Sequence, residues 1–419
     1  MTGAGDRFII VGGGQAGAWV ARTLRSEGFQ GTITIFGDED HRPYSRPPLS
    51  KEILAGERNV PGLEFLSIDD AATLRIQVLT NQPIERIDTA QKLVFPIDAA
   101  PTAYEKLFIT TGSRARQPAW IEGGRSRRLL TLRTLDDALL IQDHLASASS
   151  LIVVGGGWIG LEVAAIARLR GLQVTVLEAA DRLCKRSAPG VLSEWFLRLH
   201  ASNDVAIRLS AAVDLAYEVD GVVKVRLSTG ELLTGDVCVV GAGNVPNIEL
   251  AEHAGLKVDN GLVVDAFCQT SDPFIYAAGD VTNFPCAFSG RRVRRESWAH
   301  AQNQAVTAAK SALGAKTPYG DLPWLWSDQF GHNIQILGRP EEARRWLVRG
   351  RPEAGSGTWL ALDQDNIVLG AVSINSPKDL RPIRGHLSRG TIFDPAGDWE
   401  IPLGPDLENP RALSNRFKP

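Results

Sequence analysis

The sequence predicts an α/β protein in which two domains built on parallel sheets are joined to a smaller C-terminal α+β domain. Three observations support this fold class. The pattern G-x-G-x-x-G occurs twice in the 419 residues, opening at Gly12 and at Gly155. From residue 326 onward, short apolar segments such as NIQILG and TWLALD are instead typical of antiparallel strands. The length also fits two or three domains better than one.

The first glycine pattern lies in the run 7–38, which reads as strand, glycine turn, helix and second strand. The apolar stretch Phe8–Val11 is expected to be a parallel strand covered on both faces. The glycines that follow it are Gly12, Gly14 and Gly17. They permit a tight turn, the close approach of a pyrophosphate, and close packing of the helix on the strand. Asp38 follows the second strand and can accept hydrogen bonds from ribose hydroxyls, so the run predicts a Rossmann-like dinucleotide-binding domain.

The second pattern repeats this order from Ser150, with an apolar strand, a glycine turn and a helix. Its glycines are Gly155, Gly157 and Gly160. Glu178 ends the next strand, and a carboxylate there would repel the 2′-phosphate of NADPH, which favours NADH. Arg182 and Arg186 lie nearby and could contact a phosphate, so NADPH stays open as the alternative.

Three further segments fit the same architecture. The stretch 108–116 is a short apolar strand ending in a glycine-bearing turn, and Asp280 follows a glycine at the end of the strand in 275–283. Ligand-binding groups of α/β sheets lie at such strand ends, although either segment could also be an ordinary turn. The stretch 237–247 resembles the last strand of the second module, where Gly243 would let the backbone come close to a cofactor.

The composition narrows the function classes. A net charge of −3 argues against a nucleic-acid-binding protein. No apolar run approaches the roughly 18 residues that a membrane span needs, and no leader is recognisable, so a cytoplasmic enzyme is expected. The four cysteines are scattered and are expected to be free thiols, and the histidines show no metal-ligand spacing, so no metal site is predicted. The cysteines are Cys184, Cys238, Cys268 and Cys286.

With these residues in place, the chain resembles the FAD-dependent NADH:ferredoxin reductase components of bacterial ring-hydroxylating dioxygenase and cytochrome P450 systems. That family includes the biphenyl-dioxygenase ferredoxin reductase, putidaredoxin reductase and rubredoxin reductase. Besides the two glycine patterns, the segments that carry the resemblance are RPYSRPPLSKEIL, TLRTLDDA, YAAGDV, RRESWAHAQNQ and LPWLWSDQ. The resemblance covers essentially the whole chain and implies a glutathione-reductase-like fold.

The resemblance also implies cofactor-binding roles, one residue at a time. The residues it places at FAD are Gly12, Gly14, Ala16, Gly17, Asp38, Arg46, Pro47, Lys51, Gln82, Thr111, Gly112, Arg133, Gly279, Asp280, Glu296, Ser297, Trp298 and Trp326. Those it places at NADH are Gly155, Gly157, Ile159, Gly160, Glu162, Glu178, Arg186 and Gly243. Lys51 and Glu162 are implied as a catalytic pair beside the flavin, with two solvated surface charges as the alternative. Two positions depart from the family pattern: Asp38 follows a glycine where the ribose acid often lies, and the segment at Gln82 matches poorly.

The absence of cysteine near Lys51 decides between branches of this architecture. Disulfide reductases need two cysteines on the segment SRPPLSKEIL, and NADH oxidases and peroxidases need one, yet the segment has none. The electrons are therefore expected to leave through the flavin to an external iron–sulfur protein, most simply a Rieske-type or plant-type [2Fe–2S] ferredoxin. Basic side chains that could dock it, or could equally be a solvated face, are Arg291, Arg292, Arg294, Arg295, Lys378, Arg381 and Arg384.

The resulting domain prediction is a discontinuous FAD domain at 1–116 and 248–325, an NAD domain at 117–247, and a C-terminal α+β interface domain at 326–419. Two other functions stay open. One is an NADH-responsive binding protein resembling apoptosis-inducing factor, and the other is a diaphorase acting on a small molecule.

Overall fold

The computed structural model describes residues 5–57, 62–122 and 126–394. The chain divides into two compact units, each assembled from separate segments. The first unit comprises Met1–Ser45, Val60–Arg114 and Asn244–Asp321, and the second comprises Arg46–Asn59, Ala115–Gly243 and Leu322–Pro419. Two of the boundaries between the units fall at short strands, one within β8 (Ser113–Ala115) and one at the start of β17 (Asn244–Pro246). The end of the predicted C-terminal domain, residues 395–419, lies outside the described residues.

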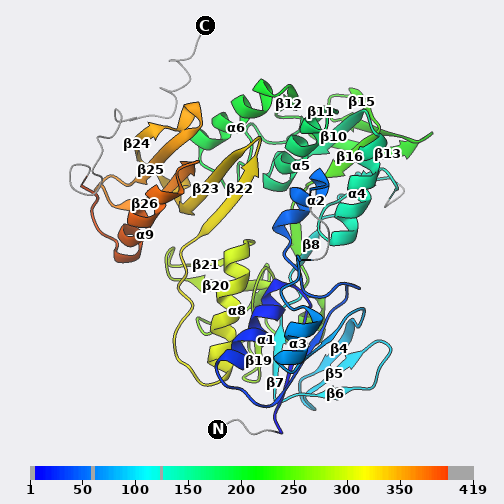
Figure 1. The fold of residues 1–419 in the computed structure, drawn as a ribbon, viewed down its shortest axis with the longest axis vertical. Coiled ribbons are helices and arrows are strands. Elements are labelled where there is room, and N and C mark those ends of the chain that lie inside the picture. Colours follow the sequence, from blue (N-terminus) through cyan, green and yellow to red (C-terminus); the bar gives the residue numbers. More distant parts are fainter. Residues whose placement is uncertain (1–4, 58–61, 123–125, 395–419) are drawn as a thin grey trace. The chain divides into compact units, whose positions relative to one another are not determined.

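The first unit is built on a five-stranded parallel sheet with the order β19-β7-β1-β2-β3 (Figure 1). Its strands are β1 (Arg7–Val11), β2 (Thr32–Phe36), β3 (Ile76–Leu79), β7 (Lys106–Ile109) and β19 (Ile275–Ala277). Its helices are α1 (Gln15–Ser26), α3 (Ile68–Thr73), α7 (Glu249–His253) and α8 (Trp298–Ala312). Two small sheets complete it: β4 (Ile84–Asp88), β5 (Leu93–Pro96) and β6 (Thr102–Ala103), and β18 (Leu262–Val263), β20 (Thr282–Cys286) and β21 (Arg291–Arg294).

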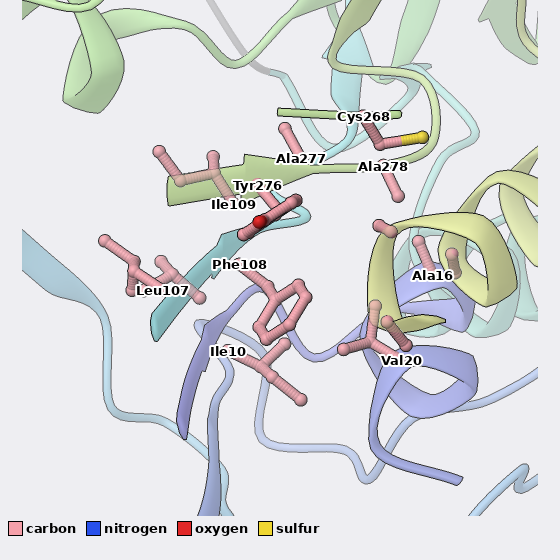
Figure 2. Packing of buried hydrophobic residues seen from close by; sticks show 14 of the residues in the cluster. Ile10, Ala16, Val20, Leu107, Phe108, Ile109, Cys268, Tyr276, Ala277 and Ala278 are labelled. Carbon is pink, nitrogen blue, oxygen red and sulfur yellow. The ribbon is translucent and has the colours of Figure 1, made fainter. Parts of the chain in front are cut away.

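The core of the first unit lies between this sheet and the paired helices α1 and α8, which pack side by side. Figure 2 shows Phe108 between Ile10 of β1 and Tyr276 of β19, close to Val20 of α1. The Phe108 and Tyr276 rings stack with their centroids 5.8 Å apart. Because both faces of the sheet are covered, the central strands are apolar throughout rather than alternating, as the sequence predicts.

The second unit contains another five-stranded parallel sheet, with the order β12-β11-β10-β16-β9. Its strands are β9 (Leu129–Leu130), β10 (Ser150–Val154), β11 (Gln173–Leu177), β12 (Val205–Arg208) and β16 (Val237–Val240). Its helices are α4 (Leu135–Ser147), α5 (Trp158–Leu169) and α6 (Gly190–Ser202). An antiparallel sheet accompanies it, formed by β13 (Val213–Val219), β14 (Val222–Leu227) and β15 (Leu232–Gly235).

The C-terminal part of this unit is an antiparallel sheet with the order β22-β23-β26-β25-β24, followed by a short helix. Its elements are β22 (Trp324–Gln329), β23 (His332–Gly338), β24 (Arg345–Arg351), β25 (Ser356–Leu362), β26 (Val368–Ile374) and α9 (Leu380–Arg389). Short 3-10 turns occur at Pro340–Glu342, Pro352–Ala354 and Pro377–Asp379. The predicted α+β character of this region is confirmed.

An early segment of the chain also belongs to the second unit. It forms the 3-10 turn η1 (Pro47–Ser50) and the short helix α2 (Glu52–Ala55). Gln142 of α4 donates to the Ile53 carbonyl at 2.7 Å, and Arg170, which ends α5, donates to the Leu54 carbonyl at 2.9 Å. These bonds anchor the segment to two helices of the second unit. Within the described part of the chain, no helix is long and apolar enough to cross a membrane.

Candidate cofactor sites

The first glycine turn has the backbone geometry that a pyrophosphate site needs. Gly12 has a φ of +118°, and a Cβ there would lie 2.3 Å from the Thr110 carbonyl oxygen. A Cβ on Gly17 would lie 2.2 Å from the Gly12 oxygen, whereas one on Gly14 would meet open space. Gly14 also caps α1 without any side-chain bond, so the first amides of the helix are not capped by a side chain. An uncapped helix N-terminus beside open space fits an anionic diphosphate.

Two other strand ends surround this turn in the first unit. Gly279 has a φ of +87°, and a Cβ there would lie 3.1 Å from the Ala16 side chain of α1. The Gly279 amide donates to Gln304 at 2.8 Å, and Ser113 donates to the half-buried Asp280 carboxylate at 3.2 Å. Asp280 is therefore held near the start of α1, and its role at the ribityl chain of FAD stays a prediction.

The beginning of α8 joins the same cluster. Gln15 of α1 donates to the Trp298 carbonyl at 2.9 Å, and Ser297 caps α8 by accepting from the His300 amide. Glu296 forms an ion pair with Arg294 and accepts a bond from Asn244 at 2.8 Å. These bonds bring the starts of α1 and α8 together.

The remaining predicted FAD residues of the first unit also lie at strand ends. Thr111 donates to the Asn247 carbonyl at 2.8 Å, and Asn247 donates back to the Thr111 carbonyl. Gly112 accepts from the Asn247 amide. Asp38 is exposed just beyond β2, and the Gln82 amide donates to the Gly37 carbonyl at 2.7 Å. The backbone at Gln82 therefore lies beside Asp38, although its role at the adenine stays a prediction.

The other predicted FAD residues are gathered in the second unit. Arg46 donates to the Arg133 carbonyl at 2.6 Å, which ties the segment before η1 to the start of α4. Trp326 stacks on Trp324 with the ring centroids 5.1 Å apart. Lys51 follows Pro47 by one turn and donates to its carbonyl at 3.3 Å. The structure thus brings the predicted FAD residues together as two groups, one in each unit.

The second glycine turn repeats the geometry of the first. A Cβ on Gly155 would lie 2.3 Å from the Gly241 oxygen, and one on Gly160 would lie 2.1 Å from the Gly155 oxygen. Gly157, which caps α5 without a side-chain bond, faces open space. Ile159 in the first turn of α5 is 38% exposed. This turn fits a second diphosphate by the same argument.

The acid and the arginine predicted at NADH flank this turn. The two carboxylate oxygens of Glu178 accept from the amides of Gly156 and Ala180, each at 2.7 Å. Arg186 lies against Gly243, where a Cβ would be only 3.0 Å from the guanidinium. Arg182 is engaged elsewhere, because it donates to the Ala188 carbonyl and to Ser193. Glu178 is therefore fixed at the tip of the module by backbone donors.

Lys51 and Glu162 form a buried ion pair rather than two solvated charges. The Lys51 ammonium lies 2.9 Å from the Glu162 carboxylate, and the two side chains are 13% and 6% exposed. Ser50 and Ser327 also donate to this carboxylate. The alternative of surface charges is wrong, because α5, the Pro47–Ala55 segment and β22 close around the pair.

Sequence reasoning missed Ser50 and Ser327, which donate to Glu162, and Gln304, which accepts from the Gly279 amide. It also missed Gln329, which donates to Ser327, and His200, whose ring lies against Gln329. A signal existed in β22, where period-2 alternation puts Leu325, Ser327 and Gln329 on one face of the strand. Ser327 and Gln329 are both buried. Polar side chains at buried positions of a strand need partners, which is the pattern that could have revealed them.

The cysteines are buried and unpaired, as predicted. Burial raises the pKa of Cys238 to about 12 and raises the pKa of Cys184 and Cys268 as well. Such thiols are poor nucleophiles because the thiolate is the reactive form. Among the described residues there is also no cluster of three or more metal-ligating side chains.

The arginines considered for docking are partly engaged within the first unit. Arg292 donates to the Val264 carbonyl at 2.7 Å and to Asn283 at 3.1 Å, and Arg295 lies 5.5 Å from the centre of the Phe284 ring. In the second unit, the side chains around α9 are exposed. They are Lys378, Arg381 and Arg384.

Two dinucleotide turns and a buried Lys–Glu pair define a two-nucleotide oxidoreductase class. Residues 6–305 match the family described as pyridine nucleotide-disulphide oxidoreductase, and residues 324–400 match the reductase C-terminal family. The chain belongs to the pyridine nucleotide-disulphide oxidoreductase family.

Individual proteins match over nearly the full length. The chain is 39% identical to rhodocoxin reductase of Rhodococcus erythropolis over 95% of this chain and 91% of that protein. It is 38% identical to the ferredoxin–NAD(+) reductase component of the p-cumate 2,3-dioxygenase system of Pseudomonas putida, over 95% of this chain and 98% of that protein. A solved covalent complex of putidaredoxin reductase with putidaredoxin matches with a TM-score of 0.89 and 34% identity, covering 94% of this chain and 95% of that one. The predicted family resemblance and fold class are confirmed.

Proposed function

We propose that this protein is an NADH:ferredoxin reductase, which takes electrons from NADH through FAD and passes them singly to a [2Fe–2S] ferredoxin that feeds an oxygenase. The observation that carries the proposal is the Pro47–Ala55 segment, which presents Lys51 to Glu162 and contains no cysteine. The cysteines elsewhere are buried and unpaired, so no thiol relay competes with electron exit from the flavin. The p-cumate dioxygenase relative, which is a ferredoxin–NAD(+) reductase component, supports the same function.

FAD, when bound, supplies the chemistry by accepting a hydride from NADH and releasing electrons one at a time. The residues of this chain bind the two nucleotides and orient their reacting rings. The proposed FAD domain is 1–116 with 248–325, the NAD domain is 117–247, and 326–419 forms the interface domain. The amides at the start of α1 would hold the FAD diphosphate, Asp280 the ribityl chain, and Ser297 with Trp298 the pyrimidine edge.

Several predicted nucleotide-binding residues of the second unit also have proposed tasks. The amides at the start of α5 would bind the NADH diphosphate, and Glu178 would accept the ribose hydroxyls and repel a 2′-phosphate. Lys51 would lie beside the flavin with its ammonium held by Glu162, where positive charge stabilises negative charge that builds up on the flavin. Trp326 would pack against the reacting rings.

The ferredoxin is proposed to dock on the exposed basic side chains around α9 of the second unit, with the exposed Arg291 of the first unit as an alternative docking residue. Arg292, Arg294 and Arg295 are weaker candidates, because their guanidinium groups already make contacts inside the first unit. An acidic partner would be attracted to such a face by long-range electrostatics. The proposed compartment is the cytoplasm, because it supplies NADH and keeps thiols such as these reduced.

The deciding experiment is anaerobic stopped-flow reduction of the holoenzyme by NADH, followed by mixing with a panel of purified [2Fe–2S] ferredoxins. We expect rapid bleaching of the flavin absorbance, then stoichiometric reduction of at least one ferredoxin. A long-lived NADH complex with no ferredoxin turnover would support the redox-switch alternative instead. Rapid turnover of a small-molecule acceptor without ferredoxin reduction would support the diaphorase alternative.

A further inference from the structure

The buried Lys51–Glu162 pair is the end of a longer polar network within the second unit. Glu162 accepts from Lys51 at 2.9 Å, from Ser327 at 2.5 Å and from Ser50. Ser327 in turn accepts from the Gln329 amide at 2.9 Å, and Gln329 Oε1 lies 2.8 Å from His200 Nε2. Ser327, Gln329 and His200 are all buried, and they come from β22 and from the last turn of α6.

The donors of this network are all directed toward Glu162. Burial lowers the pKa of His200 to about 4, so its ring is neutral near neutral pH. Because Gln329 Oε1 can only accept, the proton of that ring lies on Nε2. The Gln329 amide then donates to Ser327, so the one hydroxyl hydrogen of Ser327 is left for Glu162. Each bond in the series thus fixes the orientation of the next group.

We propose that Ser327, Gln329 and His200 are positioning residues, through which the C-terminal sheet and α6 fix the Glu162 carboxylate and hence the Lys51 ammonium. The proposal rests on the proposed function, in which Lys51 lies beside the reacting rings. The Glu162 carboxylate has donors on both oxygens and therefore little freedom to rotate, and its lysine partner is held with it. Ser327 directly follows Trp326 in β22, so the same strand carries a side chain proposed to pack against the rings and one that orients Glu162.

The test compares Ser327→Ala with Ser373→Ala. Ser373 is a matched control, because it is buried in β26 of the same sheet and its hydroxyl has no hydrogen-bond partner among the described residues. The main readout is the rate of acetylation of Lys51 by limiting acetic anhydride in the purified full-length chain, measured by peptide mass spectrometry relative to the exposed Lys378. Loss of a hydrogen bond to a charged group is expected to raise the relative Lys51 rate about tenfold in Ser327→Ala. Ser373→Ala should leave it unchanged.

Two further variants keep the proposal open to refutation if Ser327→Ala folds poorly. Ser327→Thr retains the hydroxyl and should restore the wild-type Lys51 rate. Gln329→Met keeps the volume but breaks the network one bond further out, and it should raise the Lys51 rate by a smaller factor. Equal Lys51 rates in Ser327→Ala and Ser373→Ala, or a wild-type rate in Gln329→Met, would overturn the proposal.

The same variants separate this proposal from the proposed function. Ser327→Ala should slow flavin reduction at saturating NADH about tenfold while changing the NADH KM little, because Glu178 and the α5 amides are untouched. If the wild-type enzyme reduces no ferredoxin but Lys51 still responds to Ser327→Ala, the proposed function fails and the positioning role stands. If ferredoxin is reduced and Lys51 does not respond, the positioning role fails alone.

Discussion

At the scale of single residues, the two nucleotide turns depend on where a side chain cannot fit. Gly160 has the Gly155 carbonyl oxygen 2.1 Å from the position of a Cβ, whereas Gly157 has nothing within 4 Å. Two glycines of one motif therefore have different structural roles. Gly160 permits the packing of α5 on its own turn, and Gly157 leaves room for a ligand.

Alanine substitutions should separate these two roles. Gly160→Ala should lower the free energy of unfolding by about 1–3 kcal/mol, because the new methyl group must displace backbone. Gly157→Ala should unfold like the wild type but bind NADH at least about tenfold more weakly, because the methyl group occupies the approach to the amides. Thermal unfolding measures the change in stability, and NADH titration measures the change in affinity. Wild-type stability in Gly160→Ala would contradict this assignment.

The choice of nucleotide also belongs to this scale. Glu178 is held by the Gly156 and Ala180 amides, so its charge is fixed at the tip of the second module. Glu178→Ala should raise the KM for NADH and lower that for NADPH, reducing the preference for NADH by about tenfold or more. Steady-state kinetics with ferricyanide and both nucleotides would check this. A wild-type enzyme that prefers NADPH would refute it outright.

At the scale of elements, turns are held by side chains that are distant in sequence. The turn after β19 is held by Gln304 of α8, whose Oε1 accepts from the Gly279 amide and the Thr282 hydroxyl, each at 2.8 Å. Asp280 lies inside this turn. Helix α8 therefore orients a predicted FAD-binding residue that it does not itself carry.

Replacing Gln304 with leucine should weaken FAD binding. Without the side-chain carbonyl, the Gly279 amide is left buried without its acceptor, so we expect the FAD dissociation constant to rise about tenfold. Flavin fluorescence on dilution measures the release. Ser311→Ala is the matched control, since the Ser311 hydroxyl of α8 is buried with no hydrogen-bond partner among the described residues. Equal FAD release in both variants would rule out the role of Gln304.

The junction between α6 and β22 should make stability sensitive to acid. Burial lowers the pKa of His200 to about 4, below the ordinary value of 6.5, so between these pH values the unfolded chain binds a proton that the native chain does not. The free energy of unfolding should therefore fall as the pH drops from 6.5 to 4, by up to about 1.4 kcal/mol per pH unit from this group. His300, whose pKa burial lowers to about 3, adds to the loss in the same direction.

Urea unfolding between pH 7 and pH 4.5 would measure this dependence. His200→Gln should reduce the slope of the free energy of unfolding against pH by the contribution of one histidine. The contribution of His300 should remain. His253→Gln, which changes an exposed residue of α7, should leave the slope as it is. A wild-type slope in His200→Gln would mean that His200 does not titrate in this way.

At the scale of the whole molecule, neither unit is a continuous piece of chain. The second unit takes in Arg46–Asn59, which lies early in the sequence, along with the central module and the C-terminal sheet. Lys51 therefore reaches Glu162 only because an excursion from the first unit packs against α4 and α5. The basic side chains around α9 belong to the same unit.

Reversing the charge of the basic side chains around α9 should change the rate of ferredoxin reduction and no other activity. Replacing Lys378, Arg381 and Arg384 with glutamate should lower ferredoxin reduction at low salt by about tenfold or more, since steering by opposite charge is lost. NADH-to-ferricyanide activity should stay at its wild-type value. In the wild type, ferredoxin turnover should fall steeply with added salt. Salt-insensitive ferredoxin reduction would exclude electrostatic docking on this face.

The amino-acid sequence determined what local rules can specify. Close backbone approach at Gly12 and Gly155 requires glycine, and apolar runs beside those turns require buried parallel strands, so the fold class and both modules could be predicted. The lack of cysteine around Lys51 is a property of the sequence alone, and it narrowed the redox chemistry to electron exit from the flavin.

Only the tertiary structure decided which distant side chains meet. Ser327 and His200 lie far from Glu162 along the chain, and no spacing rule relates them to it. The structure also turned Lys51 and Glu162 from two charges of uncertain exposure into one buried pair. Ser327 and Glu162 are hydrogen-bonded because each buried polar group needs a partner. That need is met by whatever the packing of β22 and α6 brings within reach, which local sequence patterns do not encode.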